Sequence, residues 1–163
     1  MLRLDADGLT AALHASGALD PSARVTAVDE RAVGTGQMGD CLRLALTYDR
    51  AVDAPASVVA KLPSSNETSR ATGMAMRTYE VEVRFYQQLA ADLPVRSPRC
   101  HHAEIDLGSG DFVLLLEDLA PAEQGDQVVG GDHGGRVVAG AVLVGDGEGV
   151  AAEIGHDLFD QRV

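Results

Sequence analysis

The stretch VGTGQMGDCLRLALTYD, Val33 to Asp49, decides the fold of this chain. It opens with three glycines in a G-x-G-x-x-G spacing, which are Gly34, Gly36 and Gly39. Leucines then occupy every second position from Leu42 to Leu46, and this alternation is typical of a β-strand rather than a helix. The glycines therefore lead into a strand.

A glycine spacing of this kind matches many turns by chance, so its surroundings decide its meaning. A dinucleotide-binding fingerprint needs its glycines between a strand and a helix. A Walker loop needs a lysine directly after its last glycine, and none follows here. The remaining interpretation is a glycine-rich hairpin that covers nucleotide phosphates, as in kinase-type folds.

The rest of the pattern predicts an α+β chain with a five-stranded antiparallel sheet and one main packed helix. The strands are expected over residues 23–33, 41–47, 57–63, 99–106 and 112–117. A short amphipathic helix should end near Gly17, and a polar loop over 64–70 should lead to the main helix, from about Gly73 to Asp92. The sequence Gly108-Ser109-Gly110 predicts a hairpin turn between the last two strands.

Composition restricts the possible functions. The 163 residues carry a net charge of -12, which argues against broad nucleic-acid binding. No run of about 18 apolar residues occurs, and the acidic N-terminal segment is unlike a signal peptide, so no membrane span or secretion is expected. Two cysteines, Cys41 and Cys100, form no disulfide framework. We therefore expect a cytoplasmic protein.

Lys61 lies within the apolar strand SVVAKLP, on the same face as Val59. A half-buried ammonium group needs a charged partner or a ligand anion. The alternative is that its side chain reaches water at the end of the strand.

The helix TYEVEVRFYQQLA offers that partner. With roughly 100° per residue, Glu82 falls in the middle of the apolar face. Glu80 and Arg84 fall on the opposite face, as an exposed i,i+4 pair. We therefore predict a buried Glu82 paired with Lys61; the alternative is a carboxylate at the helix edge that reaches water.

The acidic end of the last predicted strand and the Cys-His-His run are two further candidate sites. The strand FVLLLEDLAP stops abruptly in acids, and in kinase-type folds such a segment is the hinge whose backbone meets adenine; we assign this contact to Glu117, Asp118 and Leu119. The alternative is an ordinary buried strand followed by a loop. The run Cys100-His101-His102 predicts no metal site, because neighbouring strand residues point to opposite faces.

Four segments, taken together, resemble the N-terminal lobe of the aminoglycoside phosphotransferase and choline-kinase superfamily, closest to its ecdysteroid-kinase-like branch. They are GTGQMGDCLRLALTY, SVVAKLPS, YEVEVRFYQQLA and FVLLLEDLAPAEQGDQ, and the resemblance covers residues 25–127.

The resemblance implies ATP as a ligand. The glycine hairpin would cover the ATP phosphates with Gly34, Thr35, Gly36, Gln37, Met38 and Gly39. Lys61 would contact the α- and β-phosphates, Glu82 would orient Lys61, and residues 117–119 would form the adenine hinge. The family transfers the γ-phosphate of ATP to a hydroxyl group of a small molecule and uses Mg²⁺.

The chain departs from that family after residue 127. The family's H-G-D-x-x-x-x-N segment and its later metal-binding aspartate are not found; GDHGGR, residues 131–136, has the letters in another order. We therefore assign no catalytic residue and no metal ligand, and we expect a truncated chain that is inactive alone. The alternative function is a non-catalytic binding or regulatory module on a kinase-lobe scaffold.

We divide the chain into a kinase-like lobe, residues 1–127, and a tail, residues 128–163. The tail holds half of the 18 glycines and shows no helical or strand period. So much glycine opposes a helix by about 1 kcal/mol per residue relative to alanine. A frameshift or misplaced stop near residues 127–135 would explain the change of character, and so would a genuine short variant with a disordered tail.

Overall fold

The computed structural model describes residues 1–34, 38–94, 96–121, 123–124 and 143–144. The chain divides into two units. The first contains residues 1–92 and 98–118, and the second contains residues 93–97 and 119–163.

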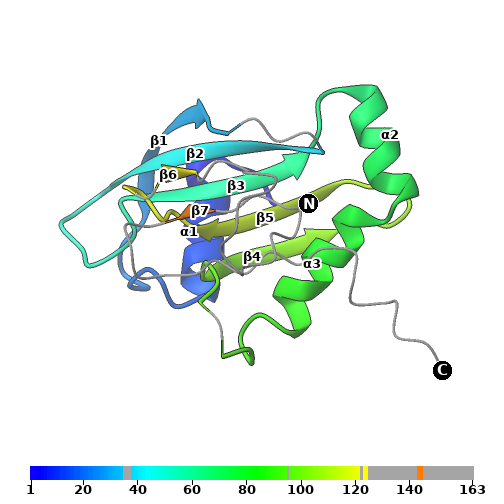
Figure 1. The fold of residues 1–163 in the computed structure, drawn as a ribbon. Coiled ribbons are helices and arrows are strands. Elements are labelled where there is room, and N and C mark those ends of the chain that lie inside the picture. Colours follow the sequence, from blue (N-terminus) through cyan, green and yellow to red (C-terminus); the bar gives the residue numbers. More distant parts are fainter. Residues whose placement is uncertain (35–37, 95, 122, 125–142, 145–163) are drawn as a thin grey trace. The chain divides into compact units, whose positions relative to one another are not determined.

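The first unit is built on a five-stranded antiparallel sheet (Figure 1). Its strands are β1 (Val25–Ala32), β2 (Gly39–Tyr48), β3 (Ser57–Pro63), β4 (Cys100–Ile105) and β5 (Phe112–Glu117). They lie in the order β1-β2-β3-β5-β4, and every neighbouring pair is antiparallel. The predicted α+β class and five-stranded sheet are confirmed.

One face of the sheet is covered by helix α1 (Ala6–Ala15), as Figure 1 shows. Asp5 caps the helix by accepting a hydrogen bond from the Gly8 amide at 2.9 Å, and Gly17 follows its end with φ of 67°. Leu9 and Leu13 point into the sheet and are fully buried with Leu44 and other strand residues. This face is an apolar core.

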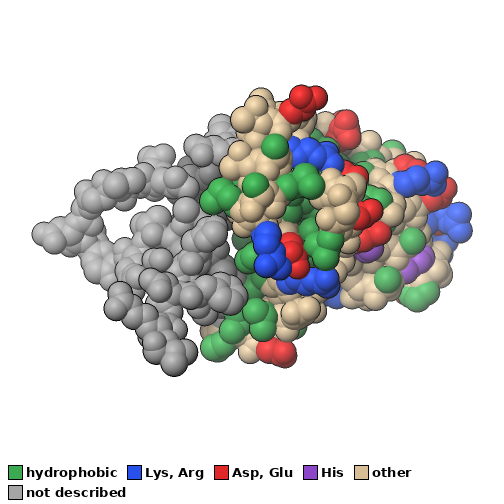
Figure 2. All heavy atoms as spheres, turned by 90° about the vertical axis from the view of Figure 1, so that its right-hand side faces the viewer, with side chains coloured by type: hydrophobic (Ala, Val, Ile, Leu, Met, Phe, Trp, Pro, Cys, Tyr) green, Lys and Arg blue, Asp and Glu red, His purple; other side chains and the backbone are tan. Residues whose placement is uncertain are grey.

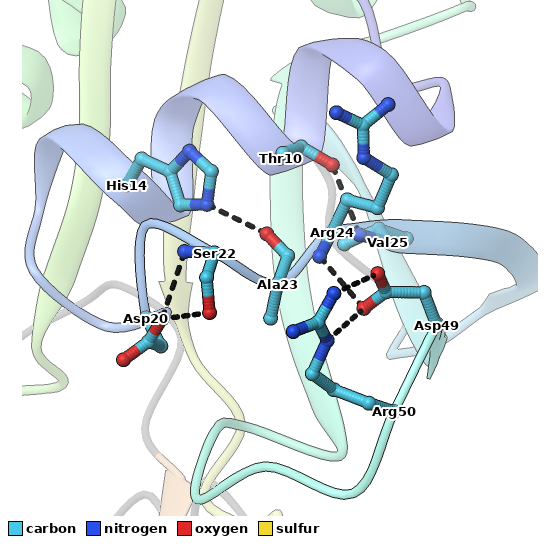
Figure 3. A network of polar contacts seen from close by, with 9 residues as sticks. All are labelled: Thr10, His14, Asp20, Ser22, Ala23, Arg24, Val25, Asp49 and Arg50. Carbon is cyan, nitrogen blue, oxygen red and sulfur yellow. Dashed lines mark hydrogen bonds and ion pairs between the residues drawn. The ribbon is translucent and has the colours of Figure 1, made fainter.

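Polar contacts fix α1 and the start of β1 to each other (Figure 3). The Thr10 hydroxyl accepts a hydrogen bond from the Val25 amide at 3.0 Å, and a ring nitrogen of His14 lies 2.8 Å from the Ala23 carbonyl. At the outer end of the β1–β2 pair, Asp49 accepts from the Arg24 amide at 3.1 Å. These contacts satisfy backbone groups at the chain's entry into the sheet.

The opposite face carries helix α3 (Thr78–Gln88). Tyr79 and Val83 of this helix are buried against Phe112, Leu114 and Leu116 of β5. The rings of Tyr79 and Phe112 have centroids 4.8 Å apart in a tilted arrangement. The helix is therefore held on the same strand that leads toward the predicted hinge.

The predicted single helix over residues 73–92 is wrong. Two helices occupy this region, α2 (Glu67–Ala75) and α3, and they are separated by Arg77 in a left-handed conformation with φ of 56°. Of the segment assigned to a loop, residues 67–70 are helical, and Asn66 caps them by accepting from the Ser69 amide at 3.0 Å. Helix α2 is mostly exposed, so its apolar pattern is weak.

The two helices pack closely at one point. A Cβ atom on Gly73 would lie 2.6 Å from the Tyr79 ring. Glycine is therefore required here by the close approach of an aromatic side chain.

The glycine segment connects β1 to β2 as the sequence predicts. The Val33 amide donates to the Cys41 carbonyl at 2.9 Å, and Gly34 has φ of 76°. Thr35, Gly36 and Gln37 lie outside the described residues. Because an antiparallel strand follows the glycines, a dinucleotide-binding strand–turn–helix unit is excluded at this position.

The second unit contains a two-stranded antiparallel sheet of β6 (Glu123–Gln124) and β7 (Leu143–Val144). Strand β7 lies in the Gly-rich tail, and the other residues of 128–163 lie outside the described ones, so the prediction of an irregular tail stays a prediction. In the described parts of the chain, no helix has the length and apolar character needed to cross a membrane.

Candidate functional site

The α3-covered face of the sheet holds an ion pair between Lys61 and Glu82. Lys61 comes from β3 and Glu82 from α3. The Nζ atom of Lys61 donates to the Oε1 atom of Glu82 at 2.5 Å. The predicted ion pair is therefore confirmed. The prediction that Glu82 is buried is wrong, because its side chain is 32% exposed and that of Lys61 is 20% exposed. Both charged groups of the pair therefore keep partial contact with solvent.

Glu82 and Glu80 differ in the cation that each contacts rather than in the exposed fraction of their side chains. The Glu80 side chain is 23% exposed and accepts from Arg77 Nε at 3.0 Å, which lowers the pKa of its carboxyl group. Arg84 donates to Gln87 at 3.0 Å, and of the predicted Glu80–Arg84 pair only a charge effect is described, because Arg84 adds a smaller contribution to the lowered pKa of Glu80. Arg77 takes the place of Arg84 because it sits at the start of α3, within reach of the first turn.

Cys41 lies directly across from Lys61 in the β2–β3 register. Opposite residues of an antiparallel pair share a face, so the thiol and the ammonium group are neighbours. Burial raises the pKa of the Cys41 thiol; Lys61 opposes this rise and Glu82 adds to it. At neutral pH Cys41 is therefore a thiol and serves as packing beside the ion pair.

Gly39 brings β2 close to the Lys61 side chain. A Cβ atom at this position would lie 2.9 Å from the Leu62 carbonyl oxygen and 3.6 Å from Lys61 Cε. A larger residue would therefore push the two strands apart or displace the lysine stem.

A hollow borders the glycine segment on the β2 side. The described residues that line it are Ala32, Val33, Gly34, Gly39, Asp40, Cys41, Leu42 and Ser65. One side of it is fixed by Asp40, which accepts from the Ser65 amide at 2.8 Å. Lys61 is not among these residues, so the hollow and the ion pair are neighbouring features rather than one pocket.

A second ion pair lies on the same face, beyond the end of β5. Arg43 of β2 donates from Nη2 to Asp118 Oδ1 at 3.0 Å, and Ser57 of β3 donates to Asp118 Oδ2 at 2.5 Å. Arg43 Nε also lies 2.7 Å from Oδ2, although it is not aligned for a hydrogen bond. The Asp118 side chain is only 4% exposed.

Sequence reasoning missed this second cluster. Strand alternation separates Arg43 from the leucines of the same strand, but it does not show which residues of other strands lie beside it. Asp118, the partner, comes directly after the apolar strand β5.

The predicted adenine stretch is thus partly engaged within the protein. The Glu117 amide donates to the Arg99 carbonyl at 2.8 Å, and the Arg99 amide donates to the Glu117 side chain at 3.1 Å. The Asp118 side chain is held by Arg43 and Ser57. Leu119 belongs to the second unit. Contact with a base at these positions stays a prediction.

The run from Cys100 to His102 serves three separate contacts. Cys100 Sγ donates to the His102 carbonyl, the His101 ring is buried 3.2 Å from the Ser16 hydroxyl, and the His102 ring lies 3.3 Å from Glu104. Among the described residues, no group of three or more His, Cys, Asp or Glu side chains is placed to hold a metal ion.

The surface on the α2–α3 side carries mixed charge. In Figure 2, Lys and Arg side chains alternate there with Asp and Glu among apolar groups, and neither sign gathers into a large patch. This face therefore offers no extended field of one sign.

No family model matches this sequence, and no curated protein is significantly similar to it.

Proposed function

We propose that this chain binds ATP on the α3-covered face of its sheet, as the nucleotide-binding half of a small-molecule phosphotransferase. The observation that carries the proposal is the Lys61–Glu82 ion pair beside the glycine-bearing β1–β2 hairpin. The resemblance of four sequence segments to the aminoglycoside phosphotransferase and choline-kinase superfamily supports it.

The chemistry of the ion pair suits a phosphate ligand. An ammonium group has three donors, and the described contact with Glu82 uses one of them. Lys61 is held in place while part of its side chain reaches solvent. Phosphate oxygens would therefore meet an oriented cation, without the full cost of desolvating a buried charge.

The length of the face also suits a nucleotide. Lys61 and Ser57 lie four residues apart on β3 and point to the same side, which separates them by about 13 Å. Val59 lies between them, with Cys41 opposite Lys61 on β2. A nucleotide along this line would place its phosphates near Lys61 and its base near Asp118.

Binding, rather than transfer, is the part of this function that the described residues can perform. The family motifs with the catalytic base and the metal-binding aspartate are not found in this sequence. No described cluster is suited to Mg²⁺, and Mg²⁺ would arrive bound to the nucleotide phosphates. In the intact reaction the proposed acceptor is a hydroxyl group of a small molecule.

Calorimetric titration with Mg·ATP tests the proposal. The unchanged chain should bind, and Lys61→Ala should weaken binding by about tenfold or more, because it removes a charge-assisted hydrogen bond. Arg84→Ala is the matched control, since Arg84 is an exposed cation that contacts only Gln87 among the described bonds. No binding by the folded, unchanged chain would refute ATP as the ligand, and equal binding by both variants would refute the role of Lys61.

A further inference from the structure

The cluster formed by Arg43, Ser57 and Asp118 holds a buried carboxylate on the α3-covered face. Its carboxylate is 4% exposed and receives groups from two strands, β2 and β3. These partners are 75 and 61 residues away from Asp118 along the chain. The cluster thus fixes the first residue beyond β5 to the centre of the sheet.

We propose that Arg43 and Ser57 are positioning residues, which hold Asp118 so that the backbone at the end of β5 can receive the base of the nucleotide. This inference rests on the proposed ATP-binding function and adds the elements that would give affinity for the base. Neither side chain needs to touch the ligand.

The burial of the Asp118 carboxylate indicates a role for the cluster besides filling space. Moving a carboxylate out of water costs several kcal/mol, and hydrophobic residues of similar volume often stabilise a protein at least as well as a buried ion pair. The ion pair does fix the orientation of the Asp118 carboxylate, because the planar guanidinium group of Arg43 approaches both of its oxygens. Ser57 adds a third contact from the neighbouring strand, which restricts rotation of the carboxylate.

The residue before Asp118 is held as well. The Glu117 amide donates to the Arg99 carbonyl, and the Glu117 side chain accepts from the Arg99 amide. Two consecutive residues at the end of β5 are therefore fixed by contacts to three other segments. These contacts hold the end of β5 in one conformation, which reduces the conformational freedom that is lost when a base binds beside it.

The experiment compares two probes, Mg·ATP and Mg·tripolyphosphate, by calorimetric titration. Arg43→Lys keeps the charge but loses the planar fork, and it should weaken Mg·ATP binding by about tenfold. Binding of Mg·tripolyphosphate, which has no base, should change by less than about twofold because Lys61 is untouched. A purely structural defect would weaken both probes equally.

Arg50→Lys is the control, because Arg50 also pairs with an aspartate, Asp49, at 3.0 Å but on the exposed end of the sheet. It should change neither affinity. If Arg43→Lys loses its cooperative melting transition, Ser57→Ala replaces it, since this variant leaves the ion pair in place; its loss should be about threefold and again confined to Mg·ATP.

The outcomes separate this inference from the function on which it rests. Equal loss for both probes, or unchanged Mg·ATP binding in folded Arg43→Lys and Ser57→Ala, overturns the positioning role while ATP binding itself stands. Absence of Mg·ATP binding in the unchanged chain overturns both.

Discussion

The two ion pairs on the α3-covered face differ in how firmly they are built. Lys61 and Glu82 make one contact, and their side chains are 20% and 32% exposed. Asp118 is 4% exposed and receives Arg43 and Ser57 together. The difference lies in the carboxylates, because the Glu82 side chain reaches solvent and that of Asp118 hardly does, whereas the two cations are alike, with Arg43 28% exposed.

This difference indicates different roles. A buried carboxylate cannot meet a ligand without losing the partners that surround it, so Asp118 is suited to fixing the chain. A partly exposed pair keeps contact with water, so its charge stays open to groups that approach from solvent. The same sheet face therefore combines a fixed end with an accessible end, and the predictions below test that contrast.

The largest effect is expected on removing Arg43. Arg43→Met should lower the free energy of unfolding by about 3–5 kcal/mol, because the buried Asp118 carboxylate would lose its contact with the Arg43 guanidinium group. Urea denaturation followed by circular dichroism measures the change. The double variant Arg43→Met/Asp118→Leu should recover most of the loss, since neither charge then remains. A loss below about 1 kcal/mol for Arg43→Met would contradict the contrast between the two pairs.

The next effect concerns the support of α3 by α2. Gly73→Ala places a Cβ atom 2.6 Å from the Tyr79 ring, which is itself packed on Phe112. Overpacking of this kind should cost about 1–3 kcal/mol of stability and displace the helix that carries Glu82. Mg·ATP binding should weaken in parallel.

Thr68→Ala on the exposed side of α2 is the control for this substitution. It should change stability by less than about 0.5 kcal/mol. If Gly73→Ala left both stability and binding unchanged, α2 would have no part in holding Glu82.

The strand pattern explains how much of this site could be predicted. Leucines at alternate positions of β2 and the apolar run of β5 fixed the sheet, and the helical wheel placed Glu82 toward Lys61. Both signals are periodic and local. The α2 helix escaped prediction because an exposed helix needs no apolar stripe, and its start depends on the single cap Asn66.

The Arg43–Asp118 pair shows a different limit. Its members are 75 residues apart, and their meeting depends on β3 lying between β2 and β5 in the sheet. Periodicity gives the face on which each residue lies, but strand order gives its neighbours. The exposed fraction of the Glu82 side chain could not be predicted either, because a helical wheel gives the direction of a side chain but not how deeply it is buried.

A smaller effect on stability is expected at the accessible pair. Lys61→Met should change the free energy of unfolding by less than about 1 kcal/mol, because solvent screens a partly exposed pair. Denaturation in urea under the conditions used for Arg43→Met gives a direct comparison. A loss as large as that of Arg43→Met would show that Lys61 is a structural residue and would remove the distinction between the pairs.

The smallest effect should appear at Cys41, which reports on the accessible pair without altering the fold. Lys61 lowers the pKa of this thiol and Glu82 raises it, while burial is the main cause of its raised value. Lys61→Met should therefore raise the pKa further and slow alkylation by iodoacetamide, whereas Glu82→Gln should lower the pKa and accelerate it. The pH dependence of alkylation in a Cys100→Ser background gives both pKa values.

Arg43→Lys is the control. Its side chain is not among the groups that shift the pKa of Cys41, so this variant should leave the rate of alkylation unchanged. Equal shifts in all three variants would mean that Cys41 senses a general loosening of β2, and that the two ion pairs are not independent.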